Sequence, residues 1–215
     1  MSNHHPDDIT MLDYAAGTLP MAQSLAVAAH LFLCETCRTR TTQLNTLGGA
    51  VLEQSSPQQI KVQEFDRFMD GIDDESVAAK AAVPKAKNGN PLAKILPERF
   101  SDINWRQQTK EIAEYDLTKS LGLKGYRVAL QKIKAGARVP EHTHKGRELT
   151  VILSGGFSDE LGVYHEGDFV SRDATHQHTP TALQNEDCIC LTVLDAPIRF
   201  TGPLLRWLNP LFAWR

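Results

Sequence analysis

The sequence predicts a chain of two domains that differ in class, an N-terminal helical bundle and a C-terminal β-barrel or β-sandwich. The first 75 residues repeat apolar side chains at helical spacing. From about residue 98 the chain instead consists of short β-branched or alternating segments separated by Gly and Pro turns. Residues 76–97 between them contain no acidic residue and have the composition of a linker. We therefore predict a helical domain over 1–78, a linker over 79–97, and a β domain with a C-terminal tail over 98–215.

Four short helices are expected in the N-terminal domain. Asp7 or Asp8 can cap the first, and Pro20 suits the start of the second. Ser56 can cap the fourth, which repeats apolar residues on one face. The expected helices are residues 8–16, residues 20 to 30, a stretch from the 34–37 turn toward 52, and residues 58–72. A bundle this small buries little apolar surface, so a bound metal or a partner would stabilise it.

Three metal-ligating residues stand close together in this region. His30, Cys34 and Cys37 form the pattern H-x3-C-x2-C, and the run AVAAHLFLCETCRTR reads as one helix that places all three on one face. Two thiolates and an imidazole suit a tetrahedral zinc, which needs a fourth ligand; the nearest candidates are His4 and His5. Ordinary helix cysteines or a redox pair are the alternatives, but a redox pair would need a preceding strand. The spacing therefore favours zinc.

A second cluster lies in the β domain. Residues 136–155 contain G-x5-H-x-H-x3-E-x6-G, in which His142 and His144 point to the same side of a strand and Glu148 follows in phase. A fourth donor is expected from a later strand, where the sequence offers His176 and His178. We favour His178, which stands one residue before a Thr-Pro pair. Three imidazoles and a carboxylate suit Zn, Mn, Fe or Ni, and the residues do not choose among them.

Composition narrows the class of protein. The chain has 215 residues, 41% of them hydrophobic and 23% charged, and no apolar run approaches the ~18 residues of a membrane span. The polar, acidic start lacks the features of a signal peptide, so we expect a cytoplasmic protein without a membrane segment. Four cysteines in a reducing compartment are expected to be metal ligands or free thiols. Cys188 and Cys190 share one face of a strand, and we favour core residues over a redox pair for them.

Charge is unevenly distributed along the chain. Residues 1–78 carry 11 acidic and 4 basic residues, whereas residues 79–215 carry 15 acidic and 19 basic residues. An acidic N-terminal domain repels nucleic acid and suits a basic protein partner. Direct binding to nucleic acid is therefore not expected.

The motifs resemble those of known families. Residues 136–155 resemble the first motif of the cupin fold, while the second motif departs from the usual pattern where Glu166 replaces a proline. The stretch ITMLDYAAGTLP…AAHLFLCETCR resembles the zinc-binding anti-sigma domain. Together they resemble the ChrR-type cupin anti-sigma factors over almost the whole chain. The resemblance implies an α + β fold, with a small zinc-bound helical bundle followed by a cupin β-barrel of the jelly-roll type.

The resemblance also implies sites and a function. His5 would complete the zinc site with His30, Cys34 and Cys37. The cupin metal would be held by His142, His144, Glu148 and His178. The helical domain would bind an extracytoplasmic-function sigma factor, and the cupin domain would be needed to release it on exposure to singlet oxygen or organic peroxide. No catalytic residue or organic cofactor is implied. The alternative is a cupin-type metal-dependent dioxygenase with a regulatory zinc domain.

Overall fold

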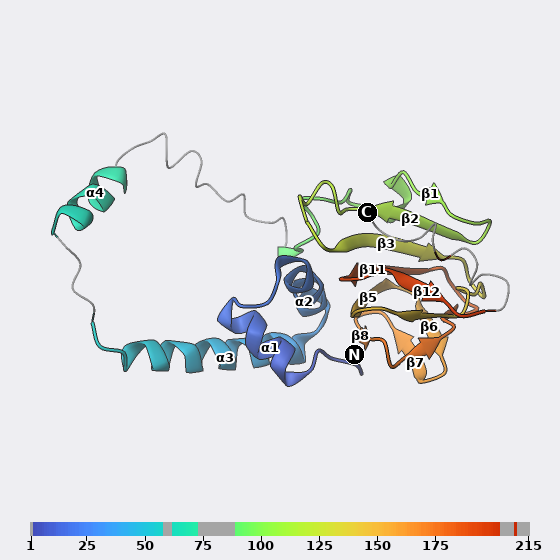
Figure 1. Ribbon diagram of the computed structural model, residues 1–215, viewed down its shortest axis with the longest axis horizontal. Coiled ribbons are helices and arrows are strands. Elements are labelled where there is room, and N and C mark those ends of the chain that lie inside the picture. The colour runs from blue at the N-terminus through green and yellow to red at the C-terminus, as the bar shows by residue number, and fades with distance from the viewer. Residues whose placement is uncertain (1, 58–61, 73–88, 203–208, 210–215) are drawn as a thin grey trace.

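The structure, a computed structural model, describes residues 2–57, 62–72, 89–202 and 209. A helical region at the N-terminus is followed by a β-barrel, as Figure 1 shows. The expected division into a helical region followed by a β domain is confirmed. The helices are α1 (Asp8–Ala16), α2 (Met21–Leu33), α3 (Glu35–Glu53), α4 (Val62–Ile72) and the 3-10 turn η2 (Phe100–Asp102).

Helix α1 begins and ends where its sequence predicts, and α2 begins where Pro20 predicts but continues to Leu33. Asp7 is the N-cap of α1, and its Oδ1 accepts a hydrogen bond from the Thr10 amide at 2.7 Å. Gly17 ends α1 in the left-handed conformation, with φ 72°, and its amide bonds back into the last turn. Pro20 immediately precedes α2. The caps at Asp7 and Gly17 satisfy helix-end backbone groups of α1 that would otherwise have no partner within the helix.

The H-x3-C-x2-C run is not one continuous helix, so this detail of the prediction was wrong. Cys34 has an extended backbone, with φ −111° and ψ 109°, and separates α2 from α3. The Cys34 amide still bonds to the His30 carbonyl, which keeps one turn of α2 intact up to the break. The donors therefore converge at a junction between two helices rather than along one helical face.

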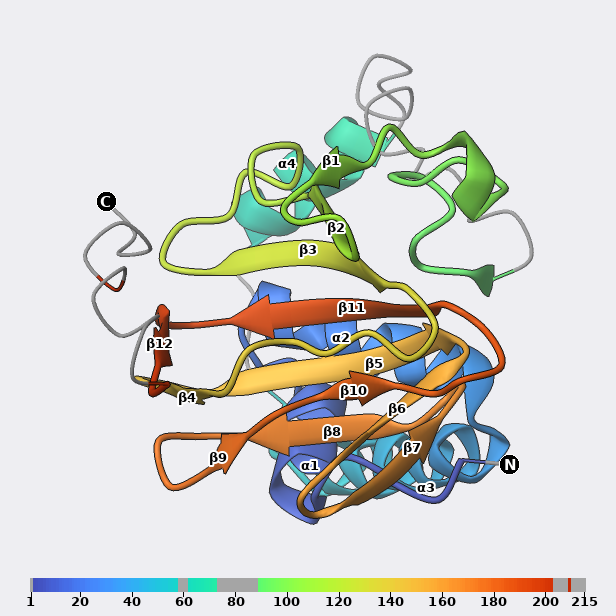
Figure 2. The same ribbon diagram turned by 90° about the vertical axis from the view of Figure 1, so that its right-hand side faces the viewer.

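The β domain is an antiparallel barrel built from three sheets. The largest has the strand order β1-β2-β3-β11-β5-β8, and two three-stranded sheets have the orders β10-β6-β7 and β12-β4-β9. Figure 2 shows these layers from the barrel side. The strands are β1 (Arg106–Gln107), β2 (Ile112–Asp116), β3 (Arg127–Ile133), β4 (His142–His144), β5 (Glu148–Ser154), β6 (Gly156–Asp159), β7 (Gly162–His165), β8 (Phe169–Arg172), β9 (Gln177–His178), β10 (Thr181–Ala182), β11 (Cys188–Leu194) and β12 (Ile198–Phe200).

The helical region and the barrel share a hydrophobic core. All seven residues of β11 are buried, because one face of the strand points into the barrel and the other lies under α2. Leu149 and Val151 of β5 join Leu191 and Val193 of β11 in the cluster that also contains α2 side chains. Ile152 and Cys188 belong instead to the cluster inside the barrel. The strand period of two thus separates an inner core from a core beneath α2.

Beyond this shared core, the helical region exposes apolar surface. The C-terminal half of α3 extends away from the body, and α4 stands apart from it (Figure 1). Leu47, Val51 and Leu52 of α3 are 59%, 63% and 73% exposed, and Phe65 and Met69 of α4 are also exposed. Several residues lie outside the described part of the chain. They are residues 73–88, which include 79–88 of the predicted linker, the tail residues 203–208 and 210–215, Ile60 and the side chain of Phe68.

Within the described part of the chain, no single helix is long and apolar enough to cross a membrane. The pair α1 and α2 meets the length and composition test only when both helices are taken together, and they are bent by 107° relative to each other.

Candidate metal centres

The first cluster of donors forms where the chain's start meets the junction of α2 and α3. One ligand atom from each of His5, His30, Cys34 and Cys37 lies within 4.8 Å of all the others. His5 Nδ1 is 3.5 Å from Cys34 Sγ and 3.4 Å from Cys37 Sγ. Two sulfur and two nitrogen donors at these separations are a set that structural zinc sites use.

The orientation of His30 fits a metal ligand. Its Nδ1–H donates to the Gly167 carbonyl of the barrel at 2.7 Å, so in the neutral ring Nε2 carries the lone pair. His30 Nε2 is buried, and among the described residues it has no hydrogen-bond partner. Metal-bound imidazoles are usually fixed in this way, with the second nitrogen donating to a carbonyl or carboxylate.

Burial keeps His30 and Cys37 uncharged when no cation is bound. Burial lowers the pKa of His30 to about 4. Burial, together with the neighbouring Cys34, raises the pKa of Cys37 to about 12. A divalent cation would reverse this preference at the thiols, because it stabilises the thiolate form.

His4 and His5, the two candidates for the fourth position, point to different surroundings. His5 faces the cysteines, whereas the His4 ring packs edge-on against Tyr164 of β7, with ring centroids 4.7 Å apart. Adjacent residues in an extended segment point in opposite directions, which explains the separation. The structure thus brings His5, and not His4, into the first cluster.

The second cluster lies inside the barrel. His142 and His144 stand on β4, Glu148 begins β5, and His178 ends β9 opposite His142. The His178 Nε2 atom is 3.1 Å from Nε2 of both His142 and His144, and Glu148 Oε2 is 3.3 Å from His144 Nε2. The structure brings His178 into this cluster, while His176 bonds to Asp173 in an exposed turn.

The imidazoles of this cluster are held with Nε2 toward one another. His142 Nδ1–H donates to the Pro140 carbonyl at 2.8 Å, and His178 Nδ1–H donates to Asp159 Oδ2 at 3.0 Å. Each bond leaves the Nε2 lone pair facing the other donors. Converging lone pairs repel one another, and a divalent cation between them removes that repulsion. The donor set therefore fits a metal of the kind that three imidazoles and a carboxylate bind.

The same burial perturbs the pKa values of the second cluster. Burial, with the neighbouring His178, lowers the pKa of His142 to about 4, and burial lowers that of His144 to about 3. Burial raises the pKa of Glu148, which His178 and Arg172 partly oppose. His142 and His144 therefore resist protonation, which leaves their lone pairs available to a cation.

The sequence alone did not indicate which residues orient the ring of His178. The Asp159 side chain is fully buried, and it also accepts a hydrogen bond from Arg172 at 2.9 Å and one from the Tyr164 hydroxyl at 3.2 Å. Burial alone would raise the pKa of Asp159, but the bonds from His178 and Arg172 hold it well below its usual range. Asp159 therefore accepts as a carboxylate and fixes the ring of His178.

Cys188 and Cys190 lie on β11 and are both buried. The neighbouring Cys188 thiol, together with burial, raises the pKa of Cys190 well above its ordinary value, and Glu148 adds to this effect. Protonated buried thiols behave as small apolar core residues.

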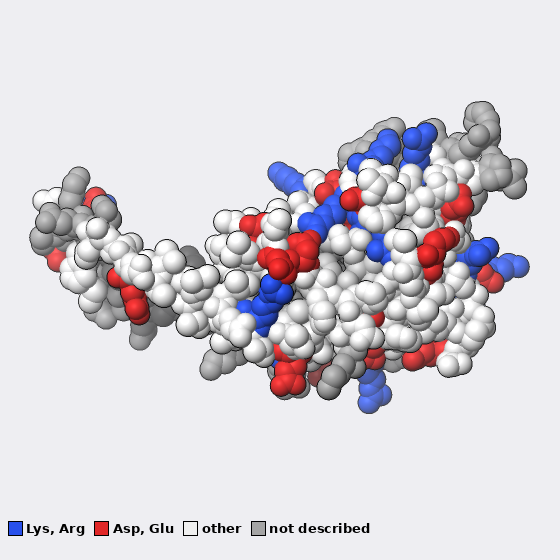
Figure 3. Space-filling view, turned by 90° about the horizontal axis from the view of Figure 1, so that it is seen from below, with Lys and Arg blue, Asp and Glu red and all other residues white. Residues whose placement is uncertain are grey.

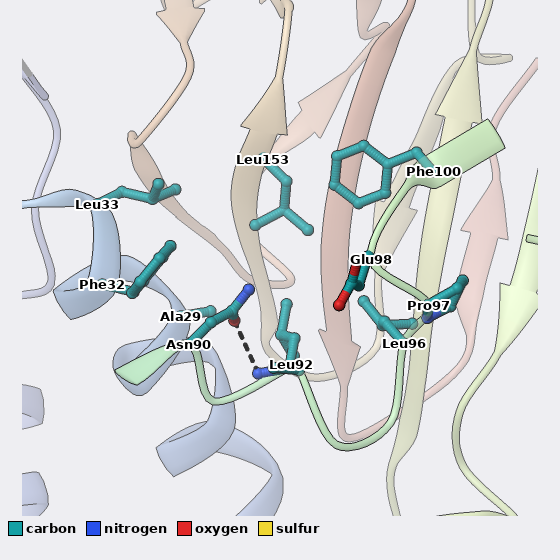
Figure 4. A pocket seen from close by; sticks show the side chains of 11 residues that line it. Ala29, Phe32, Leu33, Asn90, Leu92, Leu96, Pro97, Glu98, Phe100 and Leu153 are labelled. Atoms are coloured by element: carbon teal, nitrogen blue, oxygen red, sulfur yellow. Dashed lines mark hydrogen bonds between the residues drawn. The ribbon is translucent and has the colours of Figure 1, made fainter. Parts of the chain in front are cut away.

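A cavity of about 640 Å³ opens between α2 and the barrel. In Figure 4, Phe32 and Leu33 of α2 lie on one side, Leu153 of β5 stands above, and Leu96 and Phe100 lie on the other side. The Asn90 side chain accepts a hydrogen bond from the Leu92 amide, which fixes the turn that forms its floor. The seam between helix and barrel is thus incompletely packed on this side.

The fold and its two donor clusters define a class: a cupin-like barrel carrying a His/Glu cluster, joined to a helical region with a His/Cys cluster. The family described as ChrR Cupin-like domain matches residues 98–196. The anti-sigma-E factor ChrR of Cereibacter sphaeroides is 37% identical over an alignment of 213 residues, and the match covers 97% of each chain. This chain belongs to the ChrR family of anti-sigma factors. That relationship confirms the prediction of a regulatory protein rather than a dioxygenase.

A solved structure agrees with this relationship. The crystal structure of Rhodobacter sphaeroides SigE in complex with the anti-sigma ChrR matches with a TM-score of 0.73 and 35% identity. The match covers 90% of this chain and 99% of that one. The likeness thus extends through the helical region as well as the barrel.

Proposed function

We propose that this chain is a cytoplasmic anti-sigma factor that binds an extracytoplasmic-function sigma factor through its helical region and holds it inactive. The observation that carries the proposal is the relationship to an anti-sigma factor over 97% of both chains. The matching solved structure was determined in complex with a sigma factor, SigE. A relationship that spans both regions supports the same type of partner here.

The surface of the helical region supports a protein partner. The C-terminal half of α3 carries exposed apolar side chains, among them Leu47 and Val51. In Figure 3 the arm that carries α3 and α4 is largely uncharged, with acidic side chains at its margin. Among residues 1–78, acidic residues outnumber basic ones by 11 to 4. An apolar surface with acidic margins suits a partner that presents apolar side chains among basic ones.

The two clusters would serve different roles, one in stabilising the helical region and the other in sensing. We assign zinc to His5, His30, Cys34 and Cys37, where it would stabilise the small helical region. His142, His144, Glu148 and His178 would hold zinc, manganese, iron or nickel. Their place inside the barrel, away from the exposed α3 surface, supports a role in sensing rather than in sigma binding. In this proposal singlet oxygen or organic peroxide acts on the cupin domain and leads to release of the sigma factor.

Binding can be tested with the full-length chain. We expect it to co-purify with its cognate sigma factor and to inhibit transcription by RNA polymerase supplemented with that factor. A sigma factor from another group serves as the control for specificity. Failure to bind the cognate factor, in a protein that contains metal and is folded, would contradict the proposal.

The sensing role needs a separate experiment. His144→Ala should leave sigma inhibition intact but blunt the induction of target promoters by singlet oxygen or organic peroxide. His176→Ala, which removes a half-buried histidine outside the cluster, is the matched control and should respond normally. Normal induction in the His144→Ala strain would remove the cupin cluster from the sensing step.

A further inference from the structure

The two donor clusters are joined by a continuous set of contacts through the first residues of the chain. Residues Asn3–Asp7 pass between α1 and the barrel and carry His5 in their middle. In Figure 1 the N-terminus lies beside the strands β7 and β8. Barrel residues hold this segment at both ends, so the position of His5 depends on the barrel.

At the start of the segment, the buried carboxylate of Asp168 is the anchor. Its Oδ1 accepts from the amides of Asn3 at 2.7 Å and His4 at 3.1 Å, and its Oδ2 accepts from the His165 amide at 2.9 Å. The Phe169 amide donates to the His4 carbonyl at 3.0 Å. The same turn supplies the Gly167 carbonyl that orients His30. One barrel turn therefore contacts both the segment that carries His5 and the ring of His30.

At the end of the segment, Arg147 is the second anchor. Its Nη2 donates to Asp7 Oδ2 at 3.0 Å and to Thr10 Oγ1 at 3.1 Å. Arg147 immediately precedes Glu148, and its own amide is held by Asp195 at 2.6 Å. A shift of the first residue of β5 would therefore move the guanidinium that holds Asp7.

The barrel turn is also connected to the second cluster. Asp159 accepts from His178 Nδ1 and from the Tyr164 hydroxyl. Arg172 donates to both Asp159 and the Tyr164 hydroxyl, the latter at 2.6 Å. The Tyr164 ring then packs against His4, and Tyr164 is followed by His165, whose amide bonds to Asp168. Every contact in this series is direct and involves described residues.

We propose that Tyr164 and Arg147 couple the state of the cupin cluster to the segment Asn3–Asp7, and thereby to the His/Cys cluster. When a metal holds His178 Nε2, Nδ1–H is fixed as the donor to Asp159, and Asp159 in turn fixes the Tyr164 hydroxyl. When the cluster loses its metal, His178 and Glu148 are free to move, and the anchors of Asn3–Asp7 loosen. This inference rests on the proposed function, because these contacts are the route along which a signal would pass from the sensing cluster to the sigma-binding region. A chain with an emptied cluster therefore keeps its sigma factor bound but no longer relays the signal.

The coupling can be measured as protection of the Asn3 and His4 amides from hydrogen exchange in the full-length chain. His142→Ala would empty the cupin cluster, and Glu148→Gln provides a second, more conservative way to weaken it. Metal analysis must show that zinc at the His/Cys cluster is retained. We expect exchange at both amides to rise about fivefold on emptying, the change that follows the loss of one ordinary hydrogen bond.

The same measurement in a Tyr164→Phe, Arg147→Gln background tests the route. Exchange should already be fast there and should no longer respond to emptying, whereas Tyr115→Phe, a tyrosine on β2, should respond as the unmodified chain does. Unchanged exchange in the unmodified chain on emptying would overturn the coupling. A response that persists in the Tyr164→Phe, Arg147→Gln variant would overturn the route.

Sigma binding, measured on the same proteins, distinguishes this inference from the proposed function. A chain that shows the exchange response but does not bind its sigma factor contradicts the proposed function and leaves the coupling standing. A chain that binds its sigma factor but shows no exchange response contradicts the coupling alone.

Discussion

At the scale of single residues, neighbouring histidines at the chain's start differ in what they contact. His5 Nδ1 lies within 3.5 Å of both cysteine sulfurs, whereas His4 packs on Tyr164. We expect His5→Ala to weaken zinc binding strongly, because three donors do not complete a structural site, and His4→Ala to keep the metal. Zinc content after dialysis against a weak chelator measures the difference. Equal zinc loss in both variants would contradict the assignment of His5.

A cysteine pair offers a second comparison of this kind. Cys37→Ala removes a proposed ligand and should lower the zinc content by about one ion per chain, together with the stability of the helical region. Cys188→Ala removes an equally buried thiol from the barrel core and should cost stability without affecting that zinc. Metal analysis combined with urea denaturation separates the two effects. Retention of zinc by Cys37→Ala would place the metal elsewhere.

Residue spacing indicated both clusters but did not reveal what orients them. The repeat of His142, His144 and Glu148 places donors on one side because strand periodicity is local. Asp159 and Gly167, by contrast, orient the histidines of the two clusters that are 19 and 137 positions away. No local pattern marks such partners, because an aspartate or a turn glycine in a hairpin has many ordinary uses.

At the scale of elements, α3 has two halves with different surroundings. Its first half carries Cys37 against the body, and its second half extends outward with exposed apolar side chains. Leu47→Glu should weaken sigma binding about tenfold, because it places a charge on the proposed contact surface, while the free energy of unfolding changes little. Leu161→Glu, at a barrel site that is 60% exposed compared with 59% for Leu47, is the control. Isothermal titration of both variants tests this, and equal affinities would contradict a role for α3.

The elements themselves were largely predictable, whereas the way they join was not. The cap at Asp7 and the start at Pro20 are local signals, and α1 and α2 follow them. A turn near residues 34–37 was expected between the second and third helices, but the extended conformation of Cys34 itself was not, because the apolar period continues through it. The burial of β11 on both faces could not be predicted from the sequence either, because it depends on α2 packing against the outside of the barrel.

At the scale of the whole molecule, pH should act through both clusters at once. In the metal-stripped protein the pKa values of His30 and His142 are about 4 and that of His144 is about 3, whereas an unfolded histidine titrates near 6.5. The unfolded chain therefore binds more protons between these values, and the free energy of unfolding must fall as pH decreases from about 6.5 to about 4. The raised pKa of Glu148 has the opposite effect on the free energy of unfolding, but it is one group, whereas three histidines lower that free energy.

The size of this effect makes it measurable by urea denaturation of the metal-stripped protein. As the pH falls from about 7 to about 5, each of these buried histidines should lower the free energy of unfolding by about 2 kcal/mol. His142→Gln should reduce the pH dependence more than His176→Ala does, because His176 is only half-buried and lies outside the cluster. Zinc bound at both clusters should resist the loss until protons compete for the ligands, because bound metal keeps the rings neutral. A metal-stripped protein that is as stable at pH 5 as at pH 7 would show that the buried rings take up protons without unfolding.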